Sequence, residues 1–378
     1  MQERRIPIGP LRVTAIIIAI VVAVPAIATI ASCSGPASPS ATESPAAAPT
    51  VSPTPAITPV AAPLPTSPLT GLTETSPAPV LVVKLDNTRN AQPHAGLTDA
   101  DLVYIEEVEY GITRLAAVFS SVVPERIGPV RSARITDIDL LAQYGSPAFA
   151  FSGAQHKLLP ELAAAPFIDI SPNKGASSYS RDSNRSAPYN YFLDGTAGLK
   201  RASDATPDHD MGFAFAEEPP TGGSPALKAR MEWSYASASF SYDVQSGLYR
   251  VHLNGERARA EEHDRGQNAA TVIIQYVNQK PSVYFDKGGG NTPHADTIGQ
   301  GRALVLRDGK AWDVDWQRPD ADSGTTFTMA DGSPMPFKPG QQWIVLLDRD
   351  RSVKITAPSV QSASPRPEPS GSSSPSRG

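Results

Sequence analysis

The chain has 378 residues, a formal net charge of −5 and a single cysteine. One cysteine excludes an intramolecular disulfide, so the stability of the fold must come from an ordinary hydrophobic core. A mildly acidic chain is a poor candidate for binding nucleic acid, because that function requires a basic surface. The length allows two domains, each with a sizeable core.

The first 32 residues have the layout of a secretory signal peptide. Three arginines precede an apolar run over residues 13–30, and small residues follow it. The segment Ile30-Ala31-Ser32-Cys33 resembles the lipobox of bacterial lipoproteins. That resemblance implies that signal cleavage leaves Cys33 as the new N-terminus, carrying acyl chains such as palmitate. We therefore expect a protein anchored by lipid to the cell membrane, on its extracytoplasmic face.

The alternative for this segment is a retained transmembrane anchor, since the apolar run is nearly long enough to span a bilayer. The lipobox is favoured because the only cysteine of the chain lies where a lipobox requires one. Cleavage removes three arginines and one glutamate, so the formal charge moves from −5 to −7. The mature chain is thus still an unsuitable partner for nucleic acid.

Two segments are expected to be disordered. Residues 33–67 consist almost entirely of Pro, Ala, Ser and Thr, and residues 357–378 have a similar composition. Such segments contain too few large apolar groups to offset the entropy of ordering them. Prolines favour the extended polyproline II conformation, at about 3.1 Å per residue. The linker could therefore hold the folded part up to roughly 100 Å from the membrane.

Residues 68–218 are predicted to form a mixed α/β domain with helices on a sheet. Ile135, Ile138, Leu141 and Tyr144 recur at a spacing of three residues, which indicates one face of a helix. A second helix is expected over about 155–164. Short apolar runs predict strands at 80–85, 102–105, 113–119, 147–151 and 167–170.

Residues 230–356 are predicted to form an antiparallel β-rich domain, either a sandwich or a partly open barrel. Apolar and polar residues alternate over 240–244 and 249–253, and Asn-Gly or Asp-Gly turns stand at 254, 308 and 331. The Pro/Gly-rich segment 219–223 is expected to be a hinge between the halves. The fold class that we expect is therefore α+β. Further buried strands are expected at 271–277, 303–306 and 343–347.

Two tryptophans in this second half are candidates for a sugar site. Trp312 and Trp316 lie four residues apart on a predicted strand, which places both rings on one face. They could form a stacking platform for a carbohydrate ring, but packing within the sheet is the favoured interpretation.

The segment 128–134, Gly-Pro-Val-Arg-Ser-Ala-Arg, is the densest candidate site. Two guanidinium groups three residues apart can converge on one anion. A helix beginning here would make Ser132 its N-cap and add free backbone N–H groups to an anion site. The alternative is a structural network in which Arg131 and Arg134 pair with Glu106, Glu107 or Glu109.

Five short pieces of the first half occur together and in a specific order, and in this combination the chain resembles the YerB-type bacterial lipoproteins. The resemblance implies an envelope lipoprotein of uncharacterised function, with an α/β N-terminal domain and a β-rich C-terminal domain. Residues 180–182 and 187–190 also fit. Family members carry His where this chain has Tyr189, which weakens any scheme with a histidine base there. The five pieces are residues 68–71, 84–87, 96–101, 111–114 and 128–134.

We predict an anion-binding site but no catalytic residue. No cofactor is predicted, and no metal site either, because the histidines lack the spacing of zinc ligands. The predicted anion-binding residues are Arg114, Arg131, Ser132, Arg134 and Arg181. The predicted supporting residues are Asp86, Asn87, Asp101, Glu109 and Asn190.

Two functional hypotheses follow. The favoured one is a non-catalytic envelope module, a scaffold or binding protein whose partner is a cell-wall polymer or an envelope protein. The alternative is an enzyme acting on anionic, pyrophosphate-bearing cell-wall intermediates. The order of Asp86, Asp101 and Arg131 after strands resembles the layout of LytR-CpsA-Psr wall-polymer phosphotransferases. That resemblance implies that the four arginines hold a pyrophosphate and that Asp86 or Asp101 holds magnesium.

The lipobox yields a direct prediction. Cys33→Ala should abolish lipidation and release the protein from the membrane, or stall it with its signal uncleaved. Membrane fractionation with a labelled acyl precursor reports both outcomes. A variant that is still processed, labelled and bound to the membrane would show that the lipobox interpretation is wrong.

Overall fold

Residues 66–73 and 76–358 are described by the computed structural model of the chain, and they fall within a single structural unit. The predicted signal peptide, Cys33, nearly all of the predicted linker and the C-terminal tail beyond residue 358 lie outside the described residues. No described helix is both long enough and apolar enough to cross a membrane.

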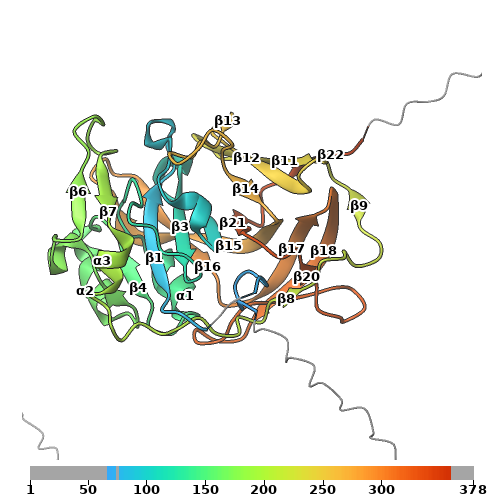
Figure 1. Ribbon diagram of the computed structural model, residues 1–378, viewed down its shortest axis with the longest axis horizontal. Helices are drawn as coiled ribbons and strands as arrows, with labels where there is room; N and C mark the ends of the chain where they lie inside the picture. Colours follow the sequence, from blue (N-terminus) through green and yellow to red (C-terminus); the bar gives the residue numbers. More distant parts are fainter. Residues whose placement is uncertain (1–65, 74–75, 359–378) are drawn as a thin grey trace, which may run out of the picture. The chain divides into compact units, whose positions relative to one another are not determined.

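Most strands belong to one 12-stranded sheet that contains parts of both halves of the chain (Figure 1). The short strands β16 (Asn291–Asp296) and β9 (Ser224–Pro225) pair with β15 and β18 of its main path. In spatial order that path runs β19 (Thr326–Thr328), β18 (Lys310–Arg318), β17 (Gly299–Arg307), β15 (Thr271–Phe285), β21 (Gln342–Asp348), β2 (Leu102–Glu107), β3 (Thr113–Phe119), β1 (Leu81–Asp86), β4 (Ala148–Ala150) and β5 (Ile168–Asp169).

A second, six-stranded sheet is built from the C-terminal half. It runs in the order β13 (Glu256–Arg257), β12 (Leu248–Leu253), β11 (Ser237–Asp243), β10 (Lys228–Glu232) and β22 (Lys354–Thr356), with β14 (Asn268–Ala269) on β12. Two small pairs complete the strands: β8 (Ala214–Phe215) with β20 (Pro336–Phe337), and β6 (Tyr179–Arg181) with β7 (Tyr191–Leu193).

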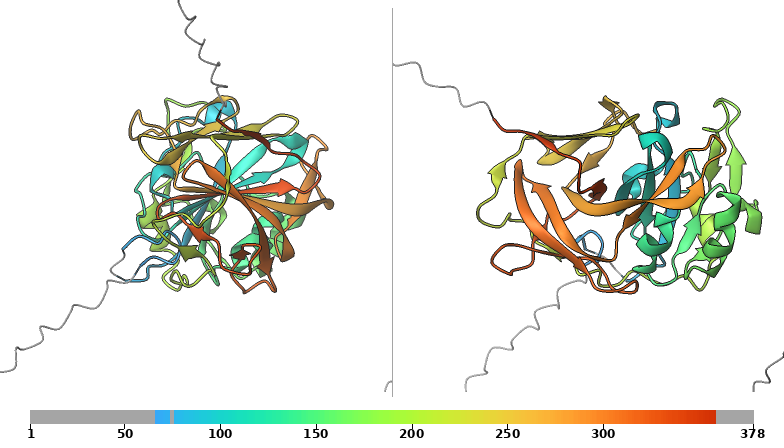
Figure 2. Two further views of the ribbon diagram at one scale, coloured as in Figure 1. Left: turned by 90° about the vertical axis from the view of Figure 1, so that its right-hand side faces the viewer. Right: turned by 180° about the vertical axis from the view of Figure 1, so that it is seen from behind.

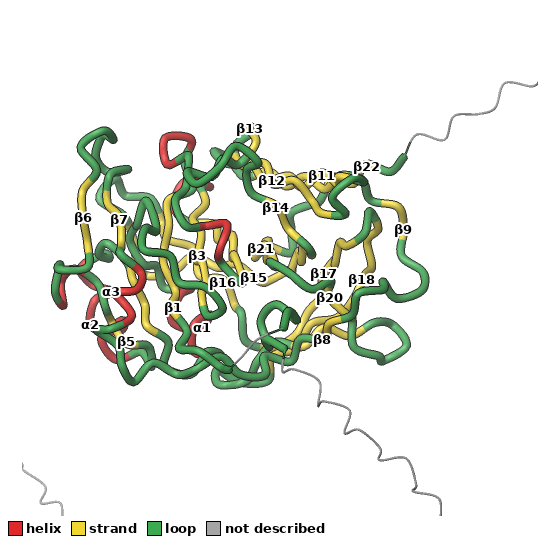
Figure 3. The backbone as a smooth tube through the Cα atoms, viewed as in Figure 1, coloured by secondary structure: helices red, strands yellow, loops and turns green. Residues whose placement is uncertain are grey.

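Helices are few and short among the described residues, as the tube in Figure 3 shows. The α-helices are α1 (Thr136–Ala142), α2 (Leu159–Ala164) and α3 (Gly195–Leu199). Single 3-10 turns are η1 (Arg89–Ala91), η2 (Leu97–Asp99), η3 (Glu109–Gly111), η4 (His156–Leu158) and η5 (Pro172–Lys174). Leu140 and Leu141 of α1 pack into the core on one face of the large sheet.

Strand β21 joins the two halves. It pairs in parallel with β15 of its own half and, on its other edge, in parallel with β2 of the N-terminal half. Gln342 faces both Thr271 and Leu102 in these registers. The two views in Figure 2 show the C-terminal strands continuing the sheet formed by the N-terminal strands. The halves therefore meet in a continuous sheet, and the segment 219–223 is not their only connection.

Hydrophobic side chains fill both faces of this sheet, because successive residues of a strand point to opposite sides. Leu81, Val83 and Leu85 of β1 belong to one core cluster, which also contains Phe240 and Val251 of the second sheet. The opposite face carries a separate cluster around Val82, Tyr104 and α1. Strands buried on both faces read as nearly continuous apolar runs, which is the pattern that predicted β1, β2 and β3.

Most of the predicted elements are confirmed, as is a strand-rich C-terminal half. The helix expected from the spacing of Ile135 and Ile138 is α1, and the turn at Asp308 joins β17 to β18. The prediction of a purely antiparallel C-terminal domain is wrong, because β15 and β21 run parallel. The helices are also fewer and shorter than a sheet covered by helices would require. The apolar run of β21 is equally compatible with either strand direction, so its sequence could not reveal this pairing.

The shared sheet predicts how a nicked protein behaves. A protease site inserted between Thr221 and Gly222, in an exposed segment, should be cut readily. The two fragments should still elute together under native conditions, because β21 stays paired with β2. Size-exclusion chromatography in native buffer and in urea, with the uncut protein as control, measures this. Separation of the fragments in native buffer would contradict the shared core.

Candidate functional site

Charged side chains gather at one end of β1, β2 and β3. Asp86, Arg114 and Glu106 are direct cross-strand partners, so their side chains share one face of the sheet. Lys84 lies two residues before Asp86 and therefore points to the same face. We use the term charged cluster for these four residues together with Glu109, Arg131, Arg134 and Asp137.

Lys84 is the centre of a buried ion triad. Its Nζ lies 2.6 Å from Glu106 Oε1 and 2.6 Å from Asp137 Oδ1, and none of the three side chains is more than 2% exposed. Burial and the nearby Asp137 carboxylate raise the pKa of Glu106. Asp137 lies in α1, so the triad attaches this helix to the sheet. Removing one partner of such a group leaves an uncompensated buried charge.

Arg131 pairs with Asp86 at the edge of the cluster. Arg131 Nε lies 2.6 Å from Asp86 Oδ2, and a quarter of the Arg131 side chain is exposed. Burial tends to raise the pKa of Asp86, but hydrogen bonds from Thr88 and the charge of Arg131 outweigh it and lower the value. The Arg131 backbone N–H donates to the Lys84 carbonyl at 2.8 Å, which fixes the segment beside β1.

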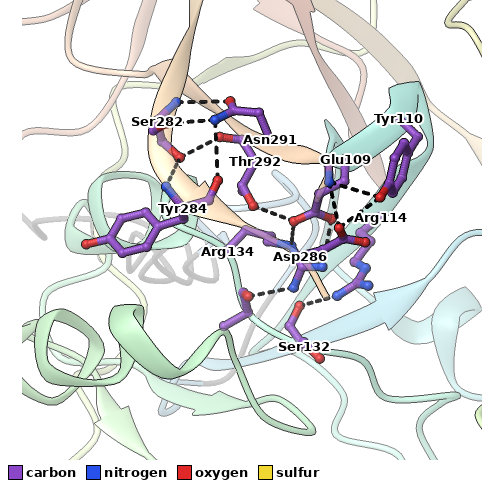
Figure 4. A network of polar contacts seen from close by, with 12 residues as sticks. Glu109, Tyr110, Arg114, Ser132, Arg134, Ser282, Tyr284, Asp286, Asn291 and Thr292 are labelled. Atoms are coloured by element: carbon purple, nitrogen blue, oxygen red, sulfur yellow. Dashed lines mark hydrogen bonds and ion pairs between the residues drawn. The ribbon is translucent and has the colours of Figure 1, made fainter. Parts of the chain in front are cut away.

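Arg134 is held by Glu109. Its Nε lies 2.7 Å from Glu109 Oε1, and its Nη2 donates to Oε2 at 2.8 Å. The hydroxyl of Thr292, from the C-terminal half, also donates to Glu109. Figure 4 shows Glu109, Arg134 and Thr292 in contact, with Arg114 beside them. For Arg134 the structure therefore supports the structural network that the sequence left open.

Arg114 differs from the other three cations of the cluster. Its side chain is buried, and its Nη1 donates to the Ser132 carbonyl at 2.6 Å. Its Nε has no hydrogen-bond partner, and no described carboxylate forms an ion pair with it. Burial and the charges of Arg134 and Arg131 lower the pKa of Arg114 to about 9. The described part of the protein thus contains a buried guanidinium without an ion-pair partner.

A hairpin from the C-terminal half lies over this region. The turn between β15 and β16 places Asp286 where its carboxylate accepts a hydrogen bond from the Tyr110 hydroxyl at 2.9 Å (Figure 4). Gly290 allows this approach, since a Cβ there would come within 2.5 Å of the Tyr110 ring. Gly288 and Gly290 are therefore sites of close packing against Tyr110, and the hairpin closes one side of the cluster.

Ser132 does not cap a helix. Helix α1 begins at Thr136 with Ile135 before it, so the expectation of a helix starting at Ser132 is wrong. The backbone N–H groups of Arg131 and Ala133 donate instead to the carbonyls of Lys84 and Gly153, and the helix begins after them. Ser132 contributes its carbonyl to Arg114, not a set of free N–H groups to an anion.

Two further predicted residues stand apart from the three central arginines. Arg181 donates to the side chain of Asn190 at 3.0 Å and stacks on the ring of Tyr191, 4.6 Å from its centroid. It is exposed on the small β6–β7 pair, and no contact with Arg114 or Arg131 is recorded for it. Arg114, Arg131 and Arg134 therefore gather in one place, whereas Arg181 and Asn190 form a separate contact.

Asp101 and Asn87 have local partners. Asp101 lies before β2, at the opposite end of the sheet from Asp86, and accepts N–H groups of Ser120 and Ser121 at 2.6 and 3.0 Å. Asn87 donates to the Thr113 hydroxyl at 2.8 Å, directly after β1. The described residues contain no group of three or more acidic, His or Cys side chains arranged to hold a metal ion.

Sequence reasoning missed Lys84, Glu106 and Asp137 as a unit. Glu106 was considered only as a partner of the arginines, and Glu107 in fact pairs with Arg351, at 2.8 Å. The available signal was Lys84 itself, a charged residue inside a continuous apolar strand run. A lysine at such a position requires a buried carboxylate partner.

Comparison with known protein families divides the chain into an N-terminal and a C-terminal domain. Residues 69–208 match the N-terminal domain, and residues 228–344 the C-terminal domain, of the family described as a protein of unknown function, DUF3048. The chain belongs to the DUF3048 family. The resemblance to YerB-type proteins and their two-domain architecture is thereby confirmed.

Two comparisons with the same Bacillus subtilis protein agree with this assignment. "Putative lipoprotein YerB" of Bacillus subtilis (strain 168) is 27% identical over 296 residues, which cover 74% of this chain and 85% of that protein. The crystal structure of the YerB protein has a TM-score of 0.63 at 24% identity, covering 76% of this chain and 99% of that one. The fold is therefore shared.

Within the DUF3048 domains the charged cluster belongs to the N-terminal domain. The hairpin that covers it, with Thr292 on Glu109 and Asp286 on Tyr110, comes from the C-terminal domain. Side chains of both domains thus surround Glu109, the partner of Arg134.

The unequal partners of Arg134 and Arg114 predict unequal effects on stability. Arg134→Gln should lower the free energy of unfolding by about 3–5 kcal/mol, because Glu109 would remain buried without its cation. Arg114→Gln should change it by less than about 1 kcal/mol or raise it, because it removes a charge that folding disfavours. Urea denaturation without added ligand measures both variants.

Arg250→Gln is a suitable control for this pair. Arg250 forms an exposed ion pair with Asp243, and such pairs contribute about 0–1 kcal/mol. If Arg114→Gln proved as destabilising as Arg134→Gln, Arg114 would be a fully paired member of the network, and its role as a binding residue would be withdrawn.

Proposed function

We propose that the protein is a lipid-anchored module of the bacterial cell envelope, whose folded part binds an anionic ligand at the charged cluster. The membrane attachment is inferred from the lipobox at Cys33 and from the name of the bacillar relative. The main support for a binding site is the state of Arg114, whose buried guanidinium has one hydrogen-bond acceptor.

An anion near Arg114 would supply the ion-pair partner that this guanidinium lacks among the described residues. Arg131 and Arg134 lie close enough to lower the pKa of Arg114, so three guanidinium groups act on the same small region. Asp86 and Glu109 pair with the two outer arginines, whereas no described carboxylate forms an ion pair with Arg114. Phosphate and carboxylate groups match the planar fork of a guanidinium and form charge-assisted hydrogen bonds with it.

Access to the cluster is expected from the side of Arg131. The Arg131 side chain is a quarter exposed and Ser132 is half-buried, whereas Arg134 and Arg114 are buried. The ligand would therefore reach Arg131 first and Arg114 behind it. Arg134, with two bonds to Glu109, acts as a positioning residue for this arrangement.

The geometry favours binding over phosphoryl transfer. The phosphotransferase hypothesis required four arginines around one pocket that faces Asp86, but Arg181 lies with Asn190 and Tyr191. Asp101 lies at the other end of the sheet, so it cannot share a ligand with Asp86. Both carboxylate oxygens of Asp86 already have partners, because Thr88 donates to Oδ1 and Arg131 pairs with Oδ2.

Inorganic pyrophosphate is a simple probe of this proposal. Titrated at constant ionic strength into the soluble chain that begins at residue 34, it should raise the melting temperature. Linkage predicts about 2.7 kcal/mol of stabilisation at a ligand concentration 100 times Kd. Arg131→Gln should weaken binding about tenfold, which corresponds to about 1.4 kcal/mol.

Arg250→Gln serves again as the matched control, since it removes a more exposed arginine from another surface. It should bind pyrophosphate as the unmodified chain does. Equal shifts in the unmodified chain and in Arg131→Gln would show that the anion acts non-specifically, and the cluster would then be purely structural.

A further inference from the structure

A polar groove lies on the C-terminal part of the large sheet, away from the charged cluster. Its main cavity has a volume of about 670 Å³ and is lined by β15, β17, β18 and the turn after β21. A second cavity of about 470 Å³ adjoins it and shares the residues Gln300, Gly301, Arg302 and Trp316. The shared residues make the two cavities parts of one elongated groove.

The groove lies where polar side chains continue one face of these strands, beyond Ile274 and Leu306 of the core on that face. Arg302 pairs with Asp315 and Leu304 with Asp313, so Arg302, Asp313 and Asp315 point to the same side. Tyr276 follows Gln275, whose register partner is Ala303, and it therefore faces the same side as Arg302. The opposite side of the same strands belongs to the apolar core.

The side chains in the groove leave hydrogen-bonding groups available. Arg302 and Asp313 form an ion pair of 2.9 Å in which both side chains are more than 70% exposed (72% and 73%). Arg351 is held by Glu107 at 2.8 Å. Within the described part of the chain, no side-chain hydrogen bond or ion pair is recorded for Arg349, Gln300 or the Tyr276 hydroxyl.

From this combination we infer that the groove binds an acidic oligosaccharide. A sugar ring offers an apolar C–H face that packs against an aromatic ring, and Tyr276 is the half-buried ring in the groove. Sugar hydroxyl groups pair with amide and charged side chains such as Gln300 and Arg302. Arg349, an unpaired guanidinium at the rim, fits a carboxylate carried by the sugar chain.

The tryptophans do not stack on the sugar. Trp316 is 3% exposed and Trp312 6% exposed, and both belong to the core beneath the strands. Trp316 Nε1 donates to the Tyr276 carbonyl at 2.9 Å, so it fixes the backbone that carries Tyr276. The favoured sequence-based interpretation of these residues as sheet packing is therefore confirmed. In the inferred complex the sugar ring packs against Tyr276 instead.

A protein partner fits this groove poorly. The centres of protein interfaces are enriched in large apolar and aromatic residues, and charged residues are depleted there. The large exposed apolar side chains of this chain, among them Tyr235, Val244 and Val283, do not line the groove. Its length, mixed charges and single accessible aromatic ring suit a polar linear chain instead.

The groove is independent of the arginine cluster. Glu106 of β2 points to the cluster, whereas the next residue, Glu107, points to the other face of the sheet and pairs with Arg351 of the groove. Failure of pyrophosphate to bind at Arg114 would therefore leave this second site untouched.

Isothermal titration with two sugars tests the inference. The probes are the hyaluronan tetrasaccharide, which alternates glucuronate with N-acetylglucosamine, and chitotetraose, which is uncharged. The soluble chain from residue 34 should bind the acidic sugar at least fivefold more tightly than the neutral one. Tyr276→Ala should weaken binding of the acidic sugar at least tenfold, and Arg349→Gln should remove the preference for it.

Arg250→Gln, on the second sheet, is the control and should bind both sugars as the unmodified chain does. Arg349 is exposed, so its variant is expected to fold even if Tyr276→Ala does not. No binding of the acidic sugar at millimolar concentration would overturn the inference. Equal binding of both sugars, or an Arg349→Gln variant that keeps the preference, would overturn it as well.

Discussion

The burial of β21 between β15 and β2 is the constraint on which the rest of the structure depends. Trp343, Val345 and Leu347 fill one face of the sheet, and Ile344 and Leu346 fill the other. Burying an aliphatic side chain of this size contributes about 1.5–3 kcal/mol. Both edges of β21 are paired, so its position also fixes the distance between the first strands of the N-terminal domain and the sheet of the C-terminal domain.

Because β21 joins the domains, polar side chains are brought together that are far apart in the sequence. The hairpin of β15 and β16 reaches across to Glu109 and Tyr110, and the turn after β21 reaches Glu107. One face of the shared sheet then carries the buried charges, and the other carries the open groove. Both regions lie near the carboxyl end of β2, where Glu106 and Glu107 point in opposite directions.

The buried charges are costly, and most of them are compensated. Removing an ion from water carries a penalty of several kcal/mol, which only close and well-formed pairs recover. Lys84, Arg131 and Arg134 each have a carboxylate at 2.6–2.7 Å. Arg114 has no such carboxylate, and burial together with the charges of Arg134 and Arg131 lowers its pKa. A buried charged group without an ion-pair partner is typical of a binding site.

The two candidate sites differ in the burial of their charged side chains, and therefore in the kind of ligand that they suit. The charged cluster is buried and shaped by pairs that hold it rigid, so it suits a small anion. The groove is open, and its ion pair of Arg302 and Asp313 is highly exposed, so it suits a longer polar ligand that replaces water.

Local patterns in the sequence determined the strands, the turns and the segment that carries the arginines. Apolar runs marked β1, β2 and β3, and Asp308-Gly309 marked a hairpin, because these features depend on neighbouring residues alone. The tertiary structure decided that β21 runs parallel to two strands, that Lys84 joins Glu106 to Asp137, and that Arg181 stays apart from Arg114. It also decided that α1 begins at Thr136 and not at Ser132, since the backbone N–H groups of Arg131 and Ala133 bond to the distant carbonyls of Lys84 and Gly153. Strand partners and buried ion pairs arise from packing between distant segments, and no local pattern encodes which segments meet.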